Sequence, residues 1–308
     1  MTASDARAEL SVVIVSYNTR DLLMRCLQEV TGQGREVIVV DNGSTDGSQD
    51  AVRHGFPDAA LIEPASNLGY GGANNLGARS ASADLVLLLN ADAWPVVGAI
   101  EALVARARAE TDVGVVGPRL RGIDGALQRS VRGFPTVWRI CTEYFFLRKL
   151  APGSEALNAF YGAGFAYESE RDADFLMGAV LLVKREAFEQ IGGFDERFFM
   201  FSEEVDLCYR LRQAGYRTVF TPTAEFVHVG GASTAPAWNL MYRQQLRGHI
   251  LFLDLHHGRA AAESCRRWLI RALRLRQVVF PGARGAIYRS AADWLDSVPV
   301  GVLVQLPV

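Results

Sequence analysis

LVLLLNADAWP (85–95) is the stretch that decides the fold, because five consecutive aliphatic residues stand directly before the triplet Asn-Ala-Asp (90–92). A short, continuous apolar run that ends in polar residues predicts a strand buried on both faces of a sheet. Two earlier stretches, SVVIVSYN (11–18) and VIVVDNGSTDGS (37–48), have the same form, with apolar residues at helical spacing between them. Such strands alternating with helices predict an α/β fold with a Rossmann-like, mostly parallel central sheet flanked by helices.

The composition is that of an ordinary globular protein. Of the 308 residues, 49% are hydrophobic and 21% are charged, and the formal net charge is −2. This balance gives no overall electrostatic attraction to nucleic acid, so we expect no nucleic-acid partner. The charge is uneven: residues 236–308 hold ten Arg against four acidic residues, a net charge of +6, which leaves −8 for the rest of the chain.

The four cysteines, Cys26, Cys141, Cys208 and Cys265, are widely spaced, with neither a CxxC pair nor histidines at zinc-finger spacing. This pattern predicts no disulfide scaffold and no zinc knuckle, and it fits a reducing cytosol. The N-terminus lacks a basic segment followed by an apolar core, and no apolar run approaches the roughly 20 residues of a membrane span. We therefore expect a cytoplasmic chain with neither an export signal nor a transmembrane helix.

Polar side chains follow the first two strands, at the edge where parallel sheets bind ligands. Asp41 ends the second strand, and its carboxylate can accept hydrogen bonds from a base N–H or a ribose hydroxyl. The other reading is that Ser44 and its neighbours only cap the next helix. Tyr17 and Asn18 end the first strand with the same ambiguity, since Asn18 also suits a helix N-cap.

The glycine-rich segment NLGYGGANN (67–75) precedes a helical stretch. Backbone N–H groups at a helix N-terminus can bind phosphate, so the segment is a candidate for a phosphate site. It does not match the GxGxxG fingerprint, and a glycine-rich turn can be purely structural. Both readings stay open on the residues alone.

Asn90 and Asp92 place two oxygen-bearing side chains two residues apart at the end of the most apolar strand. Such oxygens suit a hard cation that bridges a diphosphate, although polar residues commonly terminate strands as well. His228, in EFVHVGGAS, ends a further short strand. Its imidazole suits a Mn²⁺ or Mg²⁺ site that already holds a carboxylate, whereas most lone strand histidines are satisfied core or surface residues.

Three carboxylates, Glu203, Glu204 and Asp206, gather at the predicted start of a helix. Favourable interaction with the helix dipole explains one or two of them. A general base requires a carboxylate that faces the pocket, so the cluster is also a candidate for acid–base chemistry.

Residues 236–308 are predicted to be mostly helical, and one helix there is amphipathic. Its arginines are Arg267, Arg271 and Arg274, and its apolar face is formed by Trp268, Ala272, Leu275 and Val279. A basic amphipathic helix can lie on anionic lipid, and the alternative is a solvated arginine face on a packed helix. The net charge of +6 in this region favours the membrane surface.

The order of these motifs resembles that of family 2 glycosyltransferases, in particular bacterial rhamnosyltransferases. The motifs, within residues 10–256, are SYN, VVDNGSTDGS, NLGYGGANN, LLLNADA, FLMGAVLLVKREAFEQIGGFDERFFMFSEEVDLCYRLRQAGY and HVGGAST. The resemblance implies a GT-A fold, a nucleotide-diphospho-sugar donor, a divalent cation (Mg²⁺ or Mn²⁺) and inversion at the anomeric carbon. On this basis residues 1–235 are expected to form the nucleotide-sugar-binding and catalytic domain, and residues 236–308 a helical basic extension.

The resemblance also assigns roles to individual residues. The expected donor-binding residues are Ser16, Tyr17, Asn18, Asp41, Asn42, Ser44, Asn67, Gly69, Tyr70, Asn74, Asn90 and Ala91. Asp41 would hold the pyrimidine base, and Gly178 and Ala179 would lie on the acceptor side. The triplet 90–92 stands where the family has its DxD motif, with Asn in place of the first Asp, so Asp92 would be the principal metal ligand and His228 the second.

SEEVDL matches an acidic motif that relatives usually carry as EDVDL. Glu204 therefore stands where the general base is expected, with Glu203 beside it. Because Glu replaces Asp here, the extra methylene moves the carboxylate by about one bond length, and either glutamate remains a candidate for the base.

The motifs favour L-rhamnose from dTDP-rhamnose as the donor, with a UDP-sugar as the other choice, and a hydroxyl of a glycan or lipid-linked glycan as the acceptor. The basic tail favours cell-wall or surface polysaccharide assembly at the inner face of the plasma membrane. A catalytically silent nucleotide-sugar-binding protein gains support from Asn90 and Glu204. A sugar nucleotidyltransferase is a further alternative, but that class usually has a Gly-rich basic loop where this chain has YNTRD (17–21).

Overall fold

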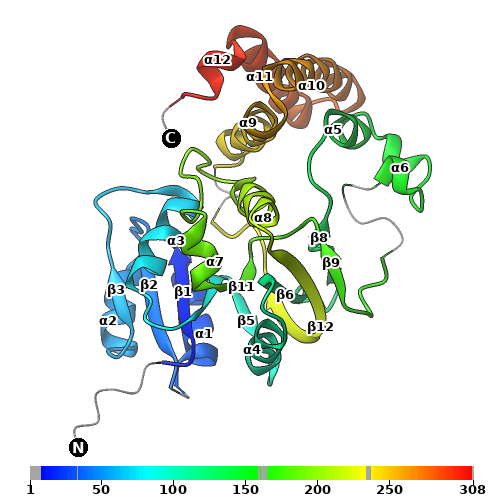
Figure 1. Ribbon diagram of the computed structural model, residues 1–308. Coiled ribbons are helices and arrows are strands. Elements are labelled where there is room, and N and C mark those ends of the chain that lie inside the picture. The colour runs from blue at the N-terminus through cyan, green and yellow to red at the C-terminus, as the bar shows by residue number, and fades with distance from the viewer. Residues whose placement is uncertain (1–7, 33, 159, 161–164, 234–236, 307–308) are drawn as a thin grey trace, which may run out of the picture.

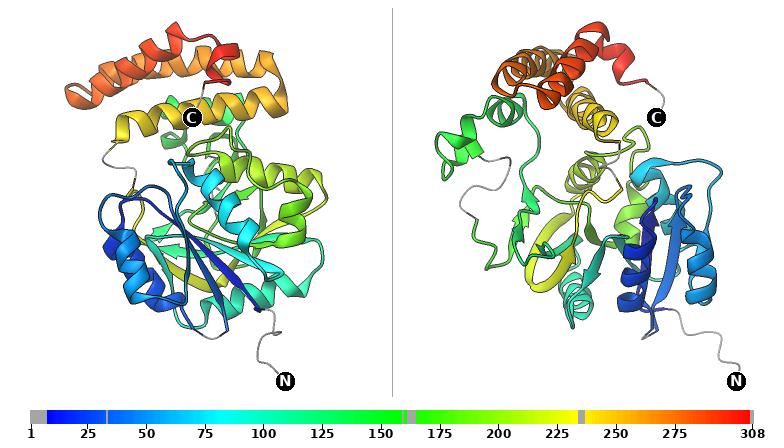
Figure 2. Two further views of the ribbon diagram at one scale, coloured as in Figure 1. Left: turned by 90° about the vertical axis from the view of Figure 1, so that its left-hand side faces the viewer. Right: turned by 180° about the vertical axis from the view of Figure 1, so that it is seen from behind.

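The computed structural model describes residues 8–32, 34–158, 160, 165–233 and 237–306. A twisted sheet occupies the half of the molecule nearer the N-terminus, and helices lie against both of its faces (Figure 1). The C-terminal helices gather at the opposite end of the molecule (Figure 2). The predicted α/β fold with a helical C-terminal region is confirmed.

Most of the strands are short and apolar. They are β1 (Ser11–Ser16), β2 (Glu36–Asp41), β3 (Ala60–Ile62), β4 (Leu85–Asn90), β5 (Ala93–Pro95), β6 (Val113–Arg121), β7 (Leu127–Gln128), β8 (Val131–Arg132), β9 (Arg171–Ala173), β10 (Phe175–Leu176), β11 (Val180–Lys184) and β12 (Arg217–His228). The helices are α1 (Arg20–Val30), α2 (Ser48–Gly55), α3 (Gly69–Ser80), α4 (Ala99–Ala109), α5 (Val137–Tyr144), the 3₁₀ turn η1 (Leu147–Lys149), α6 (Glu155–Asn158), α7 (Arg185–Gln190), α8 (Glu203–Gln213), α9 (Trp238–His257), α10 (Arg259–Val279), α11 (Ala283–Ser297) and α12 (Val300–Leu303).

Within the described residues the main sheet has the strand order β3-β2-β1-β4-β11-β6-β12-β5. β1 is parallel to β2 and β4, β2 is parallel to β3, and β6 is parallel to β12. The predicted apolar strand VLLVK is β11, which enters the middle of the sheet antiparallel to β4 and β6. The strand ending at His228 is long rather than short, since β12 has 12 residues.

The register of β1 brings predicted strand-end residues together. Ser16 lies opposite Asp41 on β2, and Val15 lies opposite Asn90 on β4. Because the three strands are parallel, their carboxyl ends form one polar edge. The donor-binding residues expected from the sequence at the ends of these strands therefore lie along this edge.

Two hydrophobic cores cover the two faces of the sheet. Ile14 of β1 packs in one core with Leu27 and Leu103, and Val13 packs in the other with Leu207. Successive side chains of a strand point to opposite faces of the sheet. When helices cover both faces, the side chains on both faces must be apolar. This explains why the strand sequences are continuously apolar.

A third core joins the C-terminal helices to the sheet region. It contains Leu246, Leu269 and Leu295 from α9, α10 and α11, together with Phe175 of β10 and Val205 of α8. The expected boundary at residues 235 and 236 lies outside the described residues. In the described part of the chain, no helix is both long enough and apolar enough to cross a bilayer.

Helix α10 buries a different stripe from the one that the sequence suggested. Its buried residues are Ala262, Cys265, Leu269, Ala272 and Leu273. Of the four residues predicted to form its apolar face, Trp268, Leu275 and Val279 are 41%, 42% and 51% exposed. The surface of α10 therefore carries bulky apolar side chains as well as arginines.

All four cysteines are free, as expected.

Candidate active site

Asp41 is held at the end of β2 with one carboxylate oxygen occupied. Its Oδ1 accepts hydrogen bonds from the backbone N–H of Ser44 and from Nε2 of Gln49, both at 2.8 Å. Its Oδ2 is buried and has no hydrogen-bond partner among the described residues. An unpartnered buried oxygen is costly, and a ligand N–H such as that of a pyrimidine base would satisfy it. Gln49, which sequence analysis missed, thus leaves Oδ2 as the available oxygen.

The residues that end β1 meet the loop after β2. The backbone N–H of Asn18 donates to Oγ of Ser44 at 2.9 Å, and Oδ1 of Asn18 accepts from the backbone N–H of Thr45 at 2.8 Å. The N-cap residues of α1 and α2 make no side-chain capping hydrogen bond, but Asp46 takes that role: its carboxylate accepts from the first backbone N–H of each helix, Arg20 at 2.8 Å and Ser48 at 3.1 Å. The capping reading therefore holds for Asp46, whereas Ser44 and Asn18 bond across the two loops. Ser16 is buried, and Tyr17, 37% exposed, presents its ring to solvent beside this loop.

Asn42 uses its side chain to hold the glycine-rich segment. Its Nδ2 donates to Oδ1 of Asn67 at 2.8 Å and to the carbonyl of Gly69 at 3.1 Å. Its Oδ1 accepts from the backbone N–H of Leu68 at 2.8 Å. Both amide hydrogens of Asn42 therefore donate to protein acceptors, and its expected contact with the donor stays a prediction.

The first two N–H groups of α3 already have partners within the protein, so they are not free to bind a phosphate. The N–H of Gly69 donates to Oδ1 of Asn67, and that of Tyr70 to the carbonyl of Phe199, both at 2.9 Å. The glycines have a packing reason instead. A Cβ atom on Gly77 would lie 2.4 Å from a methyl carbon of Val13 on β1, and a Cβ atom on Gly69 would lie 2.2 Å from the carbonyl oxygen of Phe199. Both distances are too short for a side chain.

Tyr70 and Asn74, expected to bind the donor, are buried inside the protein. The Tyr70 hydroxyl donates to the carbonyl of Gly178, and Nδ2 of Asn74 donates to the carbonyl of Tyr70 at 2.9 Å. Burial, reinforced by the nearby charges of Glu203 and Glu204, raises the pKa of Tyr70 and keeps it a neutral donor. Tyr70 thus links α3 to the acceptor-side residues.

Asp92 and His228 are far apart in the sequence but adjacent in the structure. β12 pairs with β5, which places His228 opposite Ala93. Oδ1 of Asp92 lies 3.4 Å from Nε2 of His228, and Oδ2 of Asp92 accepts from the backbone N–H of Gly230 at 3.0 Å. Both side chains are largely buried. The structure thus brings together the two residues expected to bind a cation.

Gln128, a residue that sequence analysis missed, holds the other side of His228. Its Nε2 donates to the carbonyl of His228, and its Oε1 lies 2.7 Å from Nδ1 of the ring. Gln128 belongs to the two-residue β7, within a stretch that has no periodic pattern. A contact across 100 residues leaves no local mark in the sequence.

Gly178 and Ala179 lie between the donor edge and α8. The carbonyl of Ala179 accepts from the backbone N–H of Asn90 at 3.0 Å. A Cβ on Gly178 would lie 3.5 Å from the Tyr70 ring and 3.6 Å from Cβ of Glu204. The expected acceptor-side residues are therefore next to both the donor edge and Glu204.

Glu203 and Glu204 begin α8 and have different neighbours. A Cβ on Gly71 of α3 would lie 3.6 Å from Cβ of Glu203, whereas Glu204 borders Gly178. Burial raises the pKa of both carboxyls. The charge of Glu204 raises the pKa of Glu203 further. At Glu204, backbone hydrogen bonds and the positive charge of Arg132 lower the pKa and so oppose the effect of burial. Oε2 of each glutamate is buried without a hydrogen-bond partner among the described residues. The rise in pKa is therefore larger at Glu203 than at Glu204.

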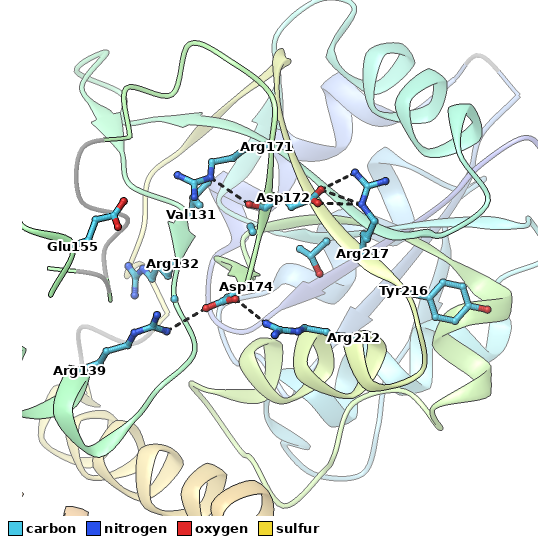
Figure 3. A pocket seen from close by; sticks show the side chains of 13 residues that line it. Val131, Arg132, Arg139, Glu155, Arg171, Asp172, Asp174, Arg212, Tyr216 and Arg217 are labelled. Carbon is cyan, nitrogen blue, oxygen red and sulfur yellow. Dashed lines mark hydrogen bonds and ion pairs between the residues drawn. The ribbon is translucent and has the colours of Figure 1, made fainter.

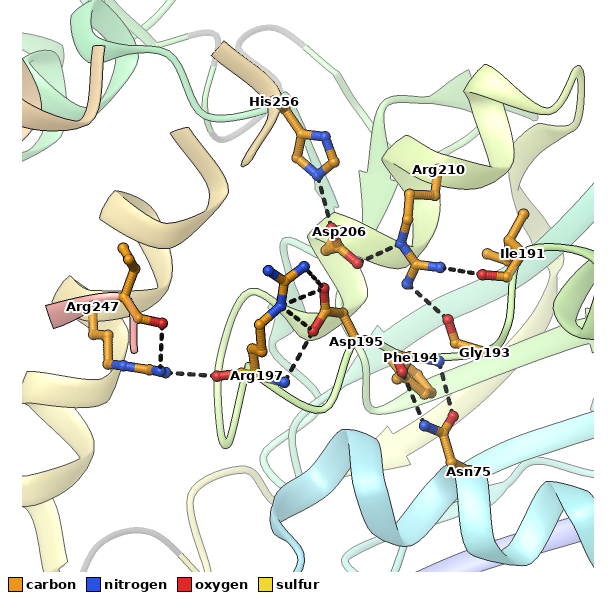
Figure 4. Close-up of polar contacts among 11 residues, drawn as sticks. Asn75, Ile191, Gly193, Phe194, Asp195, Arg197, Asp206, Arg210, Arg247 and His256 are labelled. Atoms are coloured by element: carbon orange, nitrogen blue, oxygen red, sulfur yellow. Dashed lines mark hydrogen bonds and ion pairs between the residues drawn. The ribbon is translucent and has the colours of Figure 1, made fainter. Parts of the chain in front are cut away.

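A polar network behind the glutamates fixes α8 (Figure 4). Asp206 is fully buried and accepts from Nε of Arg210 and from Nε2 of His256 on α9, both at 2.7 Å. Arg210 also donates to the carbonyls of Ile191 and Gly193 at 2.8 and 2.7 Å. The third carboxylate of the acidic cluster is therefore occupied in holding elements together.

The loop before α8 is held from both sides (Figure 4). Arg247 of α9 donates to the carbonyl of Arg197 at 2.6 Å. Asn75 of α3 bonds the backbone N–H and carbonyl of Phe194 at 2.8 and 2.9 Å. Ser202, directly before α8, has φ of 74°, a conformation that costs energy for a non-glycine residue and needs support from its surroundings.

A separate charged cavity of about 470 Å³ opens among β8, β9 and the C-terminal end of α8 (Figure 3). Asp174 in its wall pairs with Arg139 and Arg212 at 3.2 and 3.0 Å, and Asp172 pairs with Arg217 at 2.8 Å. None of the residues expected at the site lines this cavity. It is therefore distinct from the polar edge of the sheet.

Across the described ranges no group of three or more His, Cys, Asp or Glu side chains could hold a metal ion. Asp92 and His228 supply only two acceptors. Mg²⁺ is usually held by one or two carboxylates and completes its coordination with substrate phosphates and water. The pair therefore fits a cation that binds together with a diphosphate.

Comparison with protein families agrees with this architecture. Residues 11–192 match the family model described as Glycosyl transferase family 2, and residues 153–289 match Glycosyl transferase family group 2. The chain is 36% identical over 265 residues to an N-acetylglucosaminyl-diphospho-decaprenol L-rhamnosyltransferase of Mycobacterium tuberculosis, covering 81% of this chain and 85% of the relative. It is 28% identical to the low-salt glycan biosynthesis hexosyltransferase Agl10 of Haloferax volcanii, covering 67% of this chain and 62% of that protein.

Solved structures share the fold. A mannosyltransferase from Pyrobaculum calidifontis, in complex with GDP-Man and Mn²⁺, superposes with a TM-score of 0.55 at 19% identity, covering 98% of this chain and 84% of that one. GalNAc-T7 with UDP, GalNAc and Mn²⁺ superposes with a TM-score of 0.60 at 16% identity, covering 98% of this chain and 57% of that one.

Proposed function

This chain belongs to glycosyl transferase family 2, and we propose that it transfers L-rhamnose from a dTDP-linked donor to an N-acetylglucosamine hydroxyl on a lipid-linked diphosphate acceptor. Glycosyltransferase activity follows from the family. The sugar and acceptor are proposed from the relative that is 36% identical over 81% of this chain. The structural observation that supports the proposal is that the carboxyl ends of β1, β2 and β4 form one polar edge, with Asp92 3.4 Å from His228 and with Glu204 beside Gly178.

The donor nucleotide is proposed to bind at the carboxyl ends of β1 and β2. The unpartnered Oδ2 of Asp41 would accept the N–H of the pyrimidine, and the exposed Tyr17 ring offers a stacking surface. Asn42 and Asn67 shape this pocket from behind through their mutual hydrogen bond. This part of the proposal treats residues 1–235 as the catalytic domain.

The donor diphosphate is proposed to bind with Mg²⁺ or Mn²⁺ at Asp92 and His228. The structural neighbours that hold Mn²⁺ support a divalent cation in this fold. Asp92 would offer Oδ1, because Gly230 occupies its Oδ2. A cation bound there supplies positive charge against the negative charge that develops on the leaving diphosphate.

Glu204 is proposed as the general base. It borders Gly178 on the acceptor side, and Arg132 favours its ionised form, whereas Glu203 faces α3 and has the larger rise in pKa. The acceptor O–H would give its proton to Glu204 while its oxygen bonds to the anomeric carbon and the bond to the diphosphate breaks. One displacement from the opposite face inverts that carbon.

The exposed face of α10 is proposed to lie on anionic lipid, where a lipid-linked acceptor is found. Trp268, Leu275 and Val279 would enter the headgroup region, and the arginines between them would meet lipid phosphates. The guanidinium of Arg271 already lies 4.7 Å from the Trp268 ring centre, so the basic and apolar side chains form one surface.

The direct test is incubation of the protein with dTDP-L-rhamnose and a synthetic N-acetylglucosaminyl-diphospho-lipid, with and without Mn²⁺, followed by mass spectrometry. We expect a product heavier by one deoxyhexose, together with released dTDP. Transfer only from a UDP-sugar would overturn the donor assignment, and transfer only to acceptors without the diphosphate would overturn the acceptor. Binding of donor with no transfer would favour a silent nucleotide-sugar-binding protein.

A further inference from the structure

The side-chain amide of Gln128 makes two contacts with a single residue, His228. Its Nε2 donates to the backbone carbonyl of His228 at 2.7 Å, and its Oε1 lies 2.7 Å from Nδ1 of the imidazole. Gln128 ends β7 on one side of β6, and His228 ends β12 on the other side. The amide therefore connects two strands that do not pair with each other.

The backbone carbonyl decides which way this amide is oriented. A carbonyl oxygen only accepts hydrogen bonds, so the NH₂ group of Gln128 must face it. The opposite orientation would place two acceptor oxygens against each other. Oε1 therefore faces the ring, and because Oε1 also only accepts, Nδ1 of His228 must carry a hydrogen.

With its hydrogen on Nδ1, the neutral ring has its lone pair on Nε2. That atom lies 3.4 Å from Oδ1 of Asp92. Asp92 is fixed in turn, because its Oδ2 accepts from Gly230 and its backbone carbonyl accepts from the N–H of Val229, both at 3.0 Å. Nε2 of His228 and Oδ1 of Asp92 are thus two acceptor atoms close together, and each belongs to a side chain that other protein groups hold in place. A cation bound by both atoms would satisfy this arrangement.

We propose that Gln128 is a positioning residue that fixes the Nδ1–H tautomer of His228 and so presents Nε2, beside Asp92, to the divalent cation. The inference rests on the proposed metal-dependent transfer. Histidine ligands generally donate their second ring N–H to an oxygen partner, and loss of that partner typically weakens metal binding about 10- to 100-fold.

The first test reads the tautomer without metal or substrate. Two-bond ¹H–¹⁵N correlation spectra of the metal-free protein, taken at a pH well above the ordinary histidine pKa, distinguish a protonated ring nitrogen from a bare one. The His228→Asn variant identifies the signal among the five histidines. We expect the hydrogen on Nδ1 and a bare Nε2. A hydrogen on Nε2, alone or on both nitrogens, would overturn the inference.

The second test measures Mn²⁺ affinity by electron paramagnetic resonance in the presence of dTDP. Gln128→Leu removes both contacts and should weaken Mn²⁺ binding about 10- to 100-fold. Gln128→Glu keeps an oxygen for the Nδ1 hydrogen but cannot donate to the His228 carbonyl, so it should recover only part of the affinity. Gln28→Leu, at an exposed position on α1, is the matched control and should bind Mn²⁺ as the wild type does.

Thermal unfolding of the same variants separates a local effect from a folding defect. Weaker Mn²⁺ binding by Gln128→Leu at an unchanged unfolding temperature supports the inference. Equal Mn²⁺ binding by Gln128→Leu and wild type would overturn it and leave the proposed function intact. A wild type that transfers sugar without binding Mn²⁺ would overturn the metal-dependent part of that function and this inference with it.

Discussion

Nε2 of His256 on α9 lies 2.7 Å from Oδ1 of Asp206 on α8. A carboxylate oxygen only accepts, so the imidazole donates this hydrogen bond. Asp206 stands two residues after Glu204, in the turn that carries the proposed base. The C-terminal helices therefore support the geometry of the active site directly.

Removing this carboxylate should weaken the whole fold. Asp206→Ala leaves Arg210 without its ion-pair partner and His256 without an acceptor, both in a largely buried setting. We expect the free energy of unfolding to fall by about 3 kcal/mol, the lower end for a broken buried pair, because Arg210 keeps two carbonyl partners. Urea denaturation measures this loss. Asp58→Ala, an exposed aspartate, is the control, and equal losses in the two variants would contradict the prediction.

The two glutamates should differ in activity. Glu204→Gln removes the proposed base and should lower kcat about 10²- to 10⁴-fold while nucleotide affinity remains. Glu203→Gln replaces a carboxyl whose pKa burial and the charge of Glu204 raise, and which faces α3 rather than the acceptor side, so its effect on kcat should be much smaller. Steady-state kinetics with titration of dTDP checks both. The reverse order of the two effects would assign the base to Glu203.

Glu203 should also make stability depend on pH. Burial raises its pKa in the folded protein above the ordinary value of 4.5, so above that pH the folded state binds more protons than the unfolded chain. The free energy of unfolding therefore falls as the pH rises through this window. Glu203→Gln stays neutral, so it should become more stable than wild type as the pH rises from 4.5. Urea denaturation across a pH series tests this, and parallel curves would contradict it.

Gly69 should not tolerate a side chain. Its φ is +71°, and a Cβ would meet the carbonyl oxygen of Phe199 at 2.2 Å. Gly69→Ala should lower the free energy of unfolding by more than about 1 kcal/mol, since left-handed backbone alone costs that much. Gly55→Ala, where no atom lies within 4 Å and φ is not positive, is the control and should be neutral or slightly stabilising. Thermal denaturation compares the two, and equal shifts would refute the prediction.

The α10 surface should bind acidic vesicles. Arg271→Gln should weaken binding to phosphatidylglycerol vesicles by about 1 kcal/mol, roughly fivefold. Val278→Ser removes an apolar side chain that is 78% exposed on α10, and it should also weaken binding. Val97→Ser, at a fully exposed valine remote in the chain, is its control. Cosedimentation provides the measurement. If wild type remains in the supernatant, or Val97→Ser matches Val278→Ser, the lipid surface is wrong.

The main elements of the sheet were predictable because burial on both faces leaves a local signature. Residues 12–15, 37–40 and 85–89 are continuously apolar and form β1, β2 and β4. The direction of β11 was not predictable, since an apolar strand has the same composition whether it is parallel or antiparallel. Its placement between β4 and β6 depends on the path of the chain over residues distant in sequence.

For the site, positions at strand ends were predicted more successfully than roles. Asp41 and Asn90 do lie at one edge, as parallel strands require. The side-chain hydrogens of Asn42, Tyr70 and Asn74 instead donate to acceptors within the protein, although Oδ1 of Asn74 is buried without a partner among the described residues. The type of a residue shows which hydrogen bonds it can make, but only the fold shows which are already made.

The sequence by itself determined the layered α/β architecture and the family, because apolar periodicity and motif order are properties of neighbouring residues. Only the tertiary structure decided that Asp92 faces His228, that Gln128 contacts His228 and Gln49 contacts Asp41, and that α9 supports α8. These contacts are set by strand order and register, which bring distant residues within about 3 Å of each other, the distance over which hydrogen bonds act.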